Sequence, residues 1–148
     1  DQEYVDIPFT RVKTVCYYPN ILYNYLLGRE GQTMMSIKDK SMGQLMQVVM
    51  HICDYYNTSV YERNIYDIYL LNQLLIQIQL IYFSGLFEHS YDIEMLKNFD
   101  VQLKQIPILY EKSAQIVFRK YPYVKVWRKN KRKETCIMKF VIKLIKLL

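Results

Sequence analysis

Apolar residues recur every three or four positions over most of this chain, and this period predicts helices. Ser36, with Asp39 three residues later, is the expected N-cap of the most regular helix. The pattern does not decide whether that helix stops near Asn57 or continues through Tyr61 and Ile65. Its buried face is predicted to consist of Met42, Leu45, Met46, Val49, Met50, Cys53 and Tyr56.

The longest apolar stretch covers residues 68–87, which contain no charged side chain between Asp67 and Glu88. Twenty such residues are long enough to span a bilayer. Four amide side chains favour instead the central helix of a bundle, because they fall on one side of a helical wheel. They are Asn72, Gln73, Gln77 and Gln79. Ser84 and Gly85 are expected to weaken the end of this helix.

The N-terminal region is predicted to begin with an extended lead-in over Tyr4–Pro8, because a proline disfavours helical geometry at the residue before it. A helix is expected from about Thr10 to Leu27, with a kink or break at Pro19. Gly28 to Gly31 then closes that segment.

The C-terminal half predicts shorter helices. One begins at Ser90, and Pro107 is expected to stop it. Another covers Ile108 to Phe118, before Tyr121-Pro122-Tyr123 interrupts the pattern. The apolar stripe of the first consists of Ile93, Leu96, Phe99 and Leu103.

The predicted fold class is therefore all-α, because no strand alternation of convincing length and no internal repeat occur. We expect one domain over residues 1–148, a closed bundle of about five helices of which one is long, with a basic amphipathic segment at its C-terminal end.

Charge is distributed unevenly along the chain. Residues 1–118 contain 9 Lys and Arg against 13 Asp and Glu, a net charge of −4, whereas residues 119–148 contain 11 against Glu134 alone, a net charge of +10. This asymmetry predicts an anionic partner for the C-terminal end, either lipid headgroups or nucleic acid.

The basic end has the pattern of a helix that lies in a bilayer interface. Five of the six residues 128–133 are basic, and Lys139, Lys143 and Lys146 form one stripe on an otherwise apolar segment, Thr135–Leu148. Trp127, with Tyr121 and Tyr123, belongs to the residue types that favour the headgroup zone. The candidate membrane-binding residues are Arg119, Lys120, Lys125, Trp127, Arg128, Lys129, Lys131, Arg132, Lys133, Lys139, Phe140, Ile142, Lys143, Leu144, Ile145, Lys146, Leu147 and Leu148.

Two other interpretations of this end stay open. The segment Thr135–Leu148 could instead dock on the bundle and complete its core, because so apolar a tail is poorly soluble when exposed. A nucleic-acid interface would use the same basic residues, with Tyr123 and Trp127 stacking on bases. It accounts for the charge but not for the leucines and isoleucines after Cys136.

The sequence indicates no enzyme, cofactor or metal site. The chain has two histidines, His51 and His89, and contains no Gly-rich phosphate loop and no HExxH or GxSxG motif. The three cysteines, whose pairing the sequence leaves open, match no zinc or redox spacing and are interpreted as small buried residues. They are Cys16, Cys53 and Cys136.

Two features bear on the secretory pathway. Asn57-Thr58-Ser59 is a possible glycosylation sequon, which matters only in a secreted protein. The chain opens at Asp1 without a leader, and we expect a mature, processed product.

Three short stretches, in order along the chain, resemble the abalone sperm acrosomal proteins, the family of sperm lysin and, more closely, its 18 kDa fusagenic paralogue. Tyr91 also fits the pattern. The stretches are Glu3-Tyr4-Val5-Asp6 with Phe9; Gly31-Gln32-Thr33 leading into Ser36-Ile37-Lys38-Asp39-Lys40; and Arg119-Lys120-Tyr121-Pro122-Tyr123.

The resemblance implies a helical bundle released from the sperm acrosomal vesicle, and hence a secreted protein. It implies non-enzymatic membrane binding and fusion between sperm and egg, with lysin-like dissolution of the egg vitelline envelope as the alternative. The chain departs from lysin because its body is net acidic and only its end is basic. Anionic membranes of egg and sperm are the expected partners. A receptor on the egg envelope or egg membrane and self-association stay open.

Overall fold

The predicted apolar stripe over residues 42–56 forms the buried face of α2 (Asp39–Thr58). Five of its seven residues are buried, and Leu45 and Met50 pack against the same core. Ile52, which lies next to the stripe, is also buried. This computed structural model describes residues 2–17, 19–20, 39–58, 65–88, 91–116 and 122–133. The expected N-cap at Ser36 and the linker 59–64 lie outside them.

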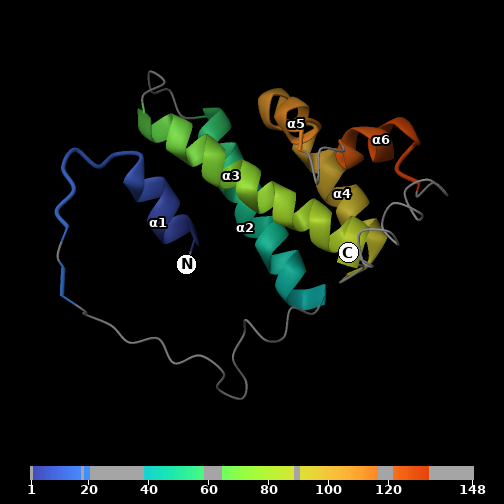
Figure 1. Cartoon of the computed structure of the whole chain (residues 1–148), viewed down its shortest axis with the longest axis horizontal. Coiled ribbons are helices and arrows are strands. Elements are labelled where there is room, and N and C mark those ends of the chain that lie inside the picture. Colours follow the sequence, from blue (N-terminus) through green and yellow to red (C-terminus); the bar gives the residue numbers. More distant parts are fainter. Residues whose placement is uncertain are drawn as a thin grey trace, which may run out of the picture.

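The central element of the bundle is α3 (Ile65–Phe83), as the uncharged stretch after Asp67 predicts. Figure 1 shows α3 crossing the middle of the molecule, with α1 on one side of it and α4, α5 and α6 on the other. Leu70, Leu74, Ile78 and Ile81 are each at most 1% exposed, because α2 and α5 pack against this helix. The fold class is all-α, and the described residues form six α-helices and one π-helical turn.

Helix α3 ends at Phe83, directly before the residues expected to weaken its end. The chain then continues through a π-helical turn, η2 (Ser84–Glu88). The hydroxyl of Tyr91 donates to the Ile81 carbonyl beside this turn. A Cβ atom at Gly85 would lie 2.6 Å from that hydroxyl, so only glycine leaves room for it. The glycine therefore permits the close approach of Tyr91 to the π-helical turn.

The next two helices follow the predicted pattern with shifted bounds. Helix α4 (Ile93–Leu103) begins at Asp92, whose side chain accepts from the Glu94 N–H at 3.0 Å, so Asp92 is the N-cap. The predicted stripe is confirmed, with Leu96, Phe99 and Leu103 buried. Pro107 does not stop this helix but opens α5 (Pro107–Ser113), where its fixed φ suits the first turn.

Helix α5 ends at Ser113, five residues before the predicted end at Phe118. The amides of Ala114, Gln115 and Ile116 each donate to the carbonyl three residues earlier, which tightens the chain into turns. This turn keeps the side chain of Ile116 buried. The last described helix, α6 (Tyr123–Lys129), follows Pro122.

The prediction for the N-terminal region was wrong in two places. Residues 4–8 are helical within α1 (Gln2–Phe9), and residues 10–17 are not. Packing outweighs the preference of the residue before Pro8, because Ile7 lies against the core and the ring of Phe9 lies 4.8 Å from that of Tyr69. Pro8 is in the last turn, where its missing N–H costs one helical bond.

Beyond α1, Val15 and Tyr17 do not pack in the core and are 67% and 85% exposed. Their helical spacing therefore does not correspond to a helix. Pro19 is likewise outside any helix, and residues 21–31 lie outside the described part of the chain. Cys16, expected to be buried, is exposed, whereas Cys53 is buried as predicted.

One face of α3 stays uncovered. Ile68, Ile76 and Leu80 are 57%, 55% and 44% exposed, beside the exposed amides of Asn72 and Gln79. Within the described residues, Asp67–Glu88 is the one helix long and apolar enough to cross a membrane, and half of its most apolar window is buried inside the bundle. Two of the four predicted amides, Asn72 and Gln79, are exposed on this face beside apolar side chains, whereas Gln73 and Gln77 are half-buried.

Candidate membrane-binding site

Helix α6 is short and ends in a turn without glycine. The amide of Lys131 donates to the Arg128 carbonyl at 3.2 Å, and that of Arg132 donates to the Trp127 carbonyl at 3.0 Å. This pair of bonds is the Schellman arrangement, which places the first residue after the helix cap in the left-handed region. Lys131 and Arg132 have φ angles of 54° and 58°. Both residues pay a steric cost for this backbone, because each has a Cβ atom.

The inner face of α6 is part of the hydrophobic core. Tyr123, Val124 and Trp127 are each at most 1% exposed. The ring of Trp127 meets that of Tyr82 edge to face at 6.1 Å, and the ring of Tyr123 meets that of Phe87 at 4.6 Å. Trp127 and Tyr123 were expected at lipid headgroups. This placement corrects that expectation, because the core of the bundle needs their rings.

Two polar atoms of this inner face have no partner in the described part of the chain. They are the Tyr123 hydroxyl and the Trp127 indole Nε1. Burial raises the pKa of Tyr123 above its ordinary value, because the phenolate would lose its hydration. Tyr123 and Trp127, which we call the aromatic anchor of α6, therefore pack in the core but leave two polar atoms without a hydrogen bond to the described residues.

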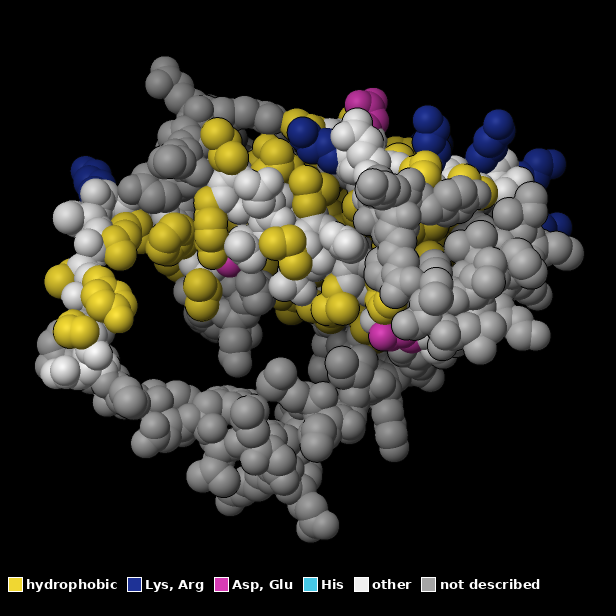
Figure 2. All heavy atoms as spheres, viewed as in Figure 1, with side chains coloured by type: hydrophobic (Ala, Val, Ile, Leu, Met, Phe, Trp, Pro, Cys, Tyr) yellow, Lys and Arg dark blue, Asp and Glu magenta, His cyan; other side chains and the backbone are white. Residues whose placement is uncertain are grey.

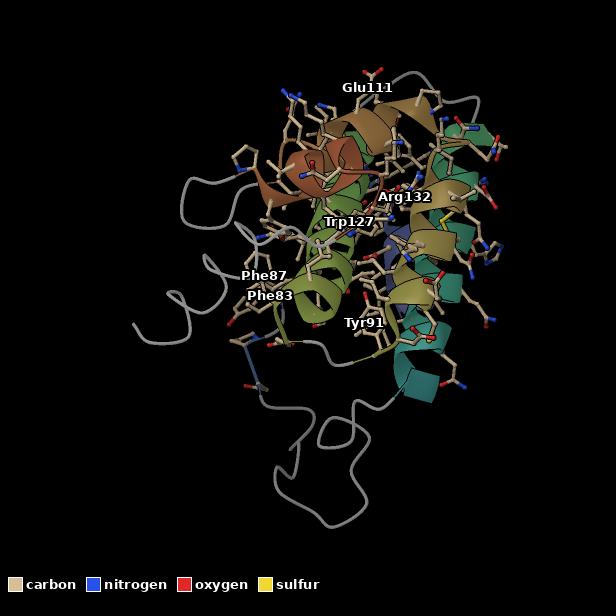
Figure 3. All side chains as sticks on the ribbon, turned by 90° about the vertical axis from the view of Figure 1, so that its right-hand side faces the viewer. Phe83, Phe87, Tyr91, Glu111, Trp127 and Arg132 are labelled. Carbon is tan, nitrogen blue, oxygen red and sulfur yellow. The ribbon has the colours of Figure 1, made fainter. Side chains whose placement is uncertain are left out.

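A buried carboxylate fixes α6 to α4. The Asp100 side chain is fully buried and accepts from the Tyr82 hydroxyl and from two arginines, with 2.6 Å to Arg128 Nε and 2.7 Å to Arg132 Nε. Figure 3 shows Arg132 lying beside Trp127, between α6 and α4. A buried charge needs such partners, because its desolvation is otherwise too costly. Asp100 thus pairs with two of the arginines that were assigned to the membrane, and its single negative charge offsets one of their two positive charges.

Arg128 is bonded through all three of its nitrogens. Nη1 donates to the Tyr110 carbonyl at 2.7 Å, and Nη2 donates to the Tyr82 hydroxyl at 2.8 Å and the Ser113 hydroxyl at 2.9 Å. Its guanidinium carbon also lies 3.7 Å from the centroid of the Tyr110 ring. Arg128 therefore joins α6 to α3, α4 and α5.

Electrostatics in this cluster follow from burial and from Asp100. Burial raises the pKa of Tyr82 well above its ordinary value, and the Asp100 charge raises it further while Arg128 opposes the shift. Burial lowers the pKa of Arg132, but the hydrogen bond and the charge of Asp100 outweigh this and raise it. Arg132 therefore stays charged and Tyr82 stays neutral.

The outer side of α6 and its turn carries lysines. All four lysines within residues 122–133 are exposed. We call them the α6 lysines: Lys125, Lys129, Lys131 and Lys133. Figure 2 shows basic side chains gathered along the edge of the molecule over α6. The six candidates 125–133 with basic side chains therefore divide into four that face solvent and two that bind Asp100.

The remaining candidates lie outside the described residues, so their positions are not assigned. They are Arg119, Lys120, Lys139, Phe140, Ile142, Lys143, Leu144, Ile145, Lys146, Leu147 and Leu148.

The cluster around Asp100 was not predicted, although the sequence contained a signal for it. Asp100 falls in the buried stripe of α4, next to Phe99 and three residues before Leu103. A carboxylate at such a position requires a basic partner. The sequence does not say which of the eleven basic residues of the C-terminal end provides it.

Other reactive groups form no site in the described ranges. No group of three or more His, Cys, Asp and Glu side chains there could hold a metal ion. Burial, and next the charge of Asp54, raises the pKa of Cys53 to about 12, which keeps this thiol protonated at neutral pH. His51 is exposed on α2, and His89 and Cys136 are not among the described residues.

Comparisons with protein-family models, with curated proteins and with solved structures gave no match to this chain.

Proposed function

We propose that the protein binds anionic membrane surfaces through the α6 lysines and promotes the fusion of sperm and egg membranes without catalysis. The observation that carries membrane binding is the exposure of all four lysines within residues 122–133, while both arginines of this stretch are directed inward. The family resemblance supports the setting: secretion from the acrosomal vesicle and action at fertilization.

Attraction of this size is sufficient for surface binding. A basic side chain near an anionic membrane contributes about 1 kcal/mol, so four lysines on one edge add to a substantial and salt-sensitive attraction. The Lys-striped apolar pattern of residues 135–148 would then supply insertion.

Burial of the aromatic rings weighs against a nucleic-acid interface. Tyr123 and Trp127, the aromatic residues nearest to the basic run, pack in the core. They are not placed to stack on bases, which is how sequence-tolerant binding of single strands gains most of its non-ionic affinity. We therefore do not propose nucleic acid as a partner.

The first test measures binding to vesicles of phosphatidylserine and phosphatidylcholine by co-sedimentation. Replacing Lys125 and Lys129 with glutamine should weaken binding roughly thirtyfold, because two surface lysines at about 1 kcal/mol each are removed. The matched control replaces Lys13 and Lys104, which are exposed elsewhere on the bundle. Equal losses in the two variants would overturn the assignment of the site to α6.

The second test separates binding from fusion. Deleting residues 135–148 should leave most of the vesicle binding but abolish lipid mixing between vesicles, because the α6 lysines stay while the inserting segment and its three lysines are lost. Full lipid mixing by the truncated protein would contradict the proposal. Dissolution of isolated egg envelopes, with no effect on pure lipid, would favour the lysin-like alternative.

A further inference from the structure

The turn after α6 combines a strained backbone with an ion pair. Lys131 and Arg132 are the non-glycine residues with positive φ among those that the structure describes, and they are adjacent. Such a backbone persists where surrounding contacts hold it. Three backbone hydrogen bonds close this turn, and the bond from Arg132 Nε to Asp100 Oδ2, at 2.7 Å, ties it to the buried cluster of the bundle.

The two arginines on Asp100 are held differently. The side chain of Arg128 is 9% exposed and donates hydrogen bonds through all three of its nitrogens. The side chain of Arg132 is 29% exposed, and its one described hydrogen bond is made by Nε. Both of its terminal nitrogens therefore keep donors for another acceptor. Of the two arginines, Arg132 is the one that can leave.

We propose that Arg132 is a switch that exchanges the Asp100 carboxylate for a lipid phosphate when the α6 lysines meet an anionic bilayer. The inference rests on the proposed function and adds the regulation of the same site. When Arg132 moves, the turn at residues 131–133 relaxes from its left-handed backbone.

This exchange leaves no isolated charge inside the bundle. Asp100 Oδ1 keeps the Tyr82 hydroxyl and Arg128 Nε, so the carboxylate stays neutralised after Arg132 departs. A guanidinium matches a phosphate with two parallel bonds, whereas Arg132 gives Asp100 one. Lys129 and Lys131 would bring the phosphates close, because both are exposed on the same edge.

The first arm of the test uses the full-length protein without lipid and follows amide hydrogen exchange at Lys131 and Arg132. Arg132→Gln should speed exchange there about tenfold, because the turn loses its bond to a charged partner. Lys133→Gln removes the same charge from the same turn and should change nothing. The amide of Asn130, bonded to the Val126 carbonyl, is the internal reference. Equal exchange in the two variants would show that the ion pair does not hold the turn and would overturn the switch.

The second arm adds phosphatidylserine vesicles to the wild-type protein. Bound protein should exchange faster at Lys131 and Arg132, although membrane binding normally slows exchange. Sedimentation with the vesicles without faster exchange would overturn the switch and leave the proposed function standing. Failure to sediment would overturn the proposed function and remove the trigger of the switch. Equal acceleration by inorganic phosphate alone would overturn the assignment to a lipid surface.

Discussion

The two faces of α6 use the same positive charge for opposite purposes. On the inner face, Arg128 and Arg132 bind one buried carboxylate of α4, and on the outer face four lysines meet solvent. The difference follows from side-chain chemistry, because a planar guanidinium offers five donors to a buried cluster and a lysine ammonium is a strongly hydrated point charge. Net charge along the sequence therefore overstates what this segment presents to a partner.

The largest effect should come from removing a charge on the inner face. Arg128→Met leaves Asp100 buried with one cationic partner and the hydroxyl oxygens of Tyr82 and Ser113 without a donor, so unfolding should become easier by about 3 to 5 kcal/mol. Lys129→Met, the adjacent exposed position, should change stability by about 0.5 kcal/mol or less. Urea denaturation followed by the fluorescence of Trp127, the single tryptophan of the chain, measures both.

The two variants test the comparison directly. If Lys129→Met destabilised the protein as much as Arg128→Met, the outer face would also be structural. If neither variant lowered the free energy of unfolding, the Asp100 cluster would make no net contribution to stability.

The sequence predicts the core of this bundle better than its polar cluster. The stripes of α2 and α4 follow from apolar spacing, which reports burial whatever the neighbouring helix is. Asp100 shows the limit, because its position in a stripe indicates a buried charge but not its partner. Arg128 and Arg132 lie close to Asp100 because Trp127 packs α6 against the core. Local spacing along the sequence does not predict this tertiary contact.

The same limit explains the errors in the N-terminal region. The rule that a proline disfavours helix at the preceding residue predicts an extended chain at Pro8, yet Ile7 and Phe9 gain enough from packing to keep α1 helical. Val15 and Tyr17 show the reverse case, since their helical spacing meets no surface to bury against. Local preference decides little where a few long-range contacts determine the outcome.

The second prediction compares two buried tyrosines, one inside the polar cluster and one on the aromatic anchor of α6. Tyr82→Phe removes the bond to the charged Asp100 and should cost about 1.5 to 3 kcal/mol of stability. Tyr123→Phe removes a hydroxyl with no described partner and should be neutral or slightly stabilising. Urea midpoints give both values, and a comparable loss in Tyr123→Phe would mean that its hydroxyl has a partner in solution.

The smallest expected effect concerns the turn that joins the two faces. Lys131 occupies a left-handed position that glycine adopts without a steric cost, so Lys131→Gly should stabilise the protein by up to about 1 kcal/mol, reduced by the greater freedom of glycine in the unfolded chain. Lys125→Gly removes the same charge inside α6, where glycine costs about 1 kcal/mol, and should destabilise it.

Thermal melts of these two glycine variants should therefore shift in opposite directions. Because each variant loses one surface lysine, electrostatics alone would move both melting temperatures in the same direction. A parallel shift would mean that the turn is not strained. Opposite shifts would show that Lys131 keeps a left-handed backbone against its own preference, a strain that glycine relieves.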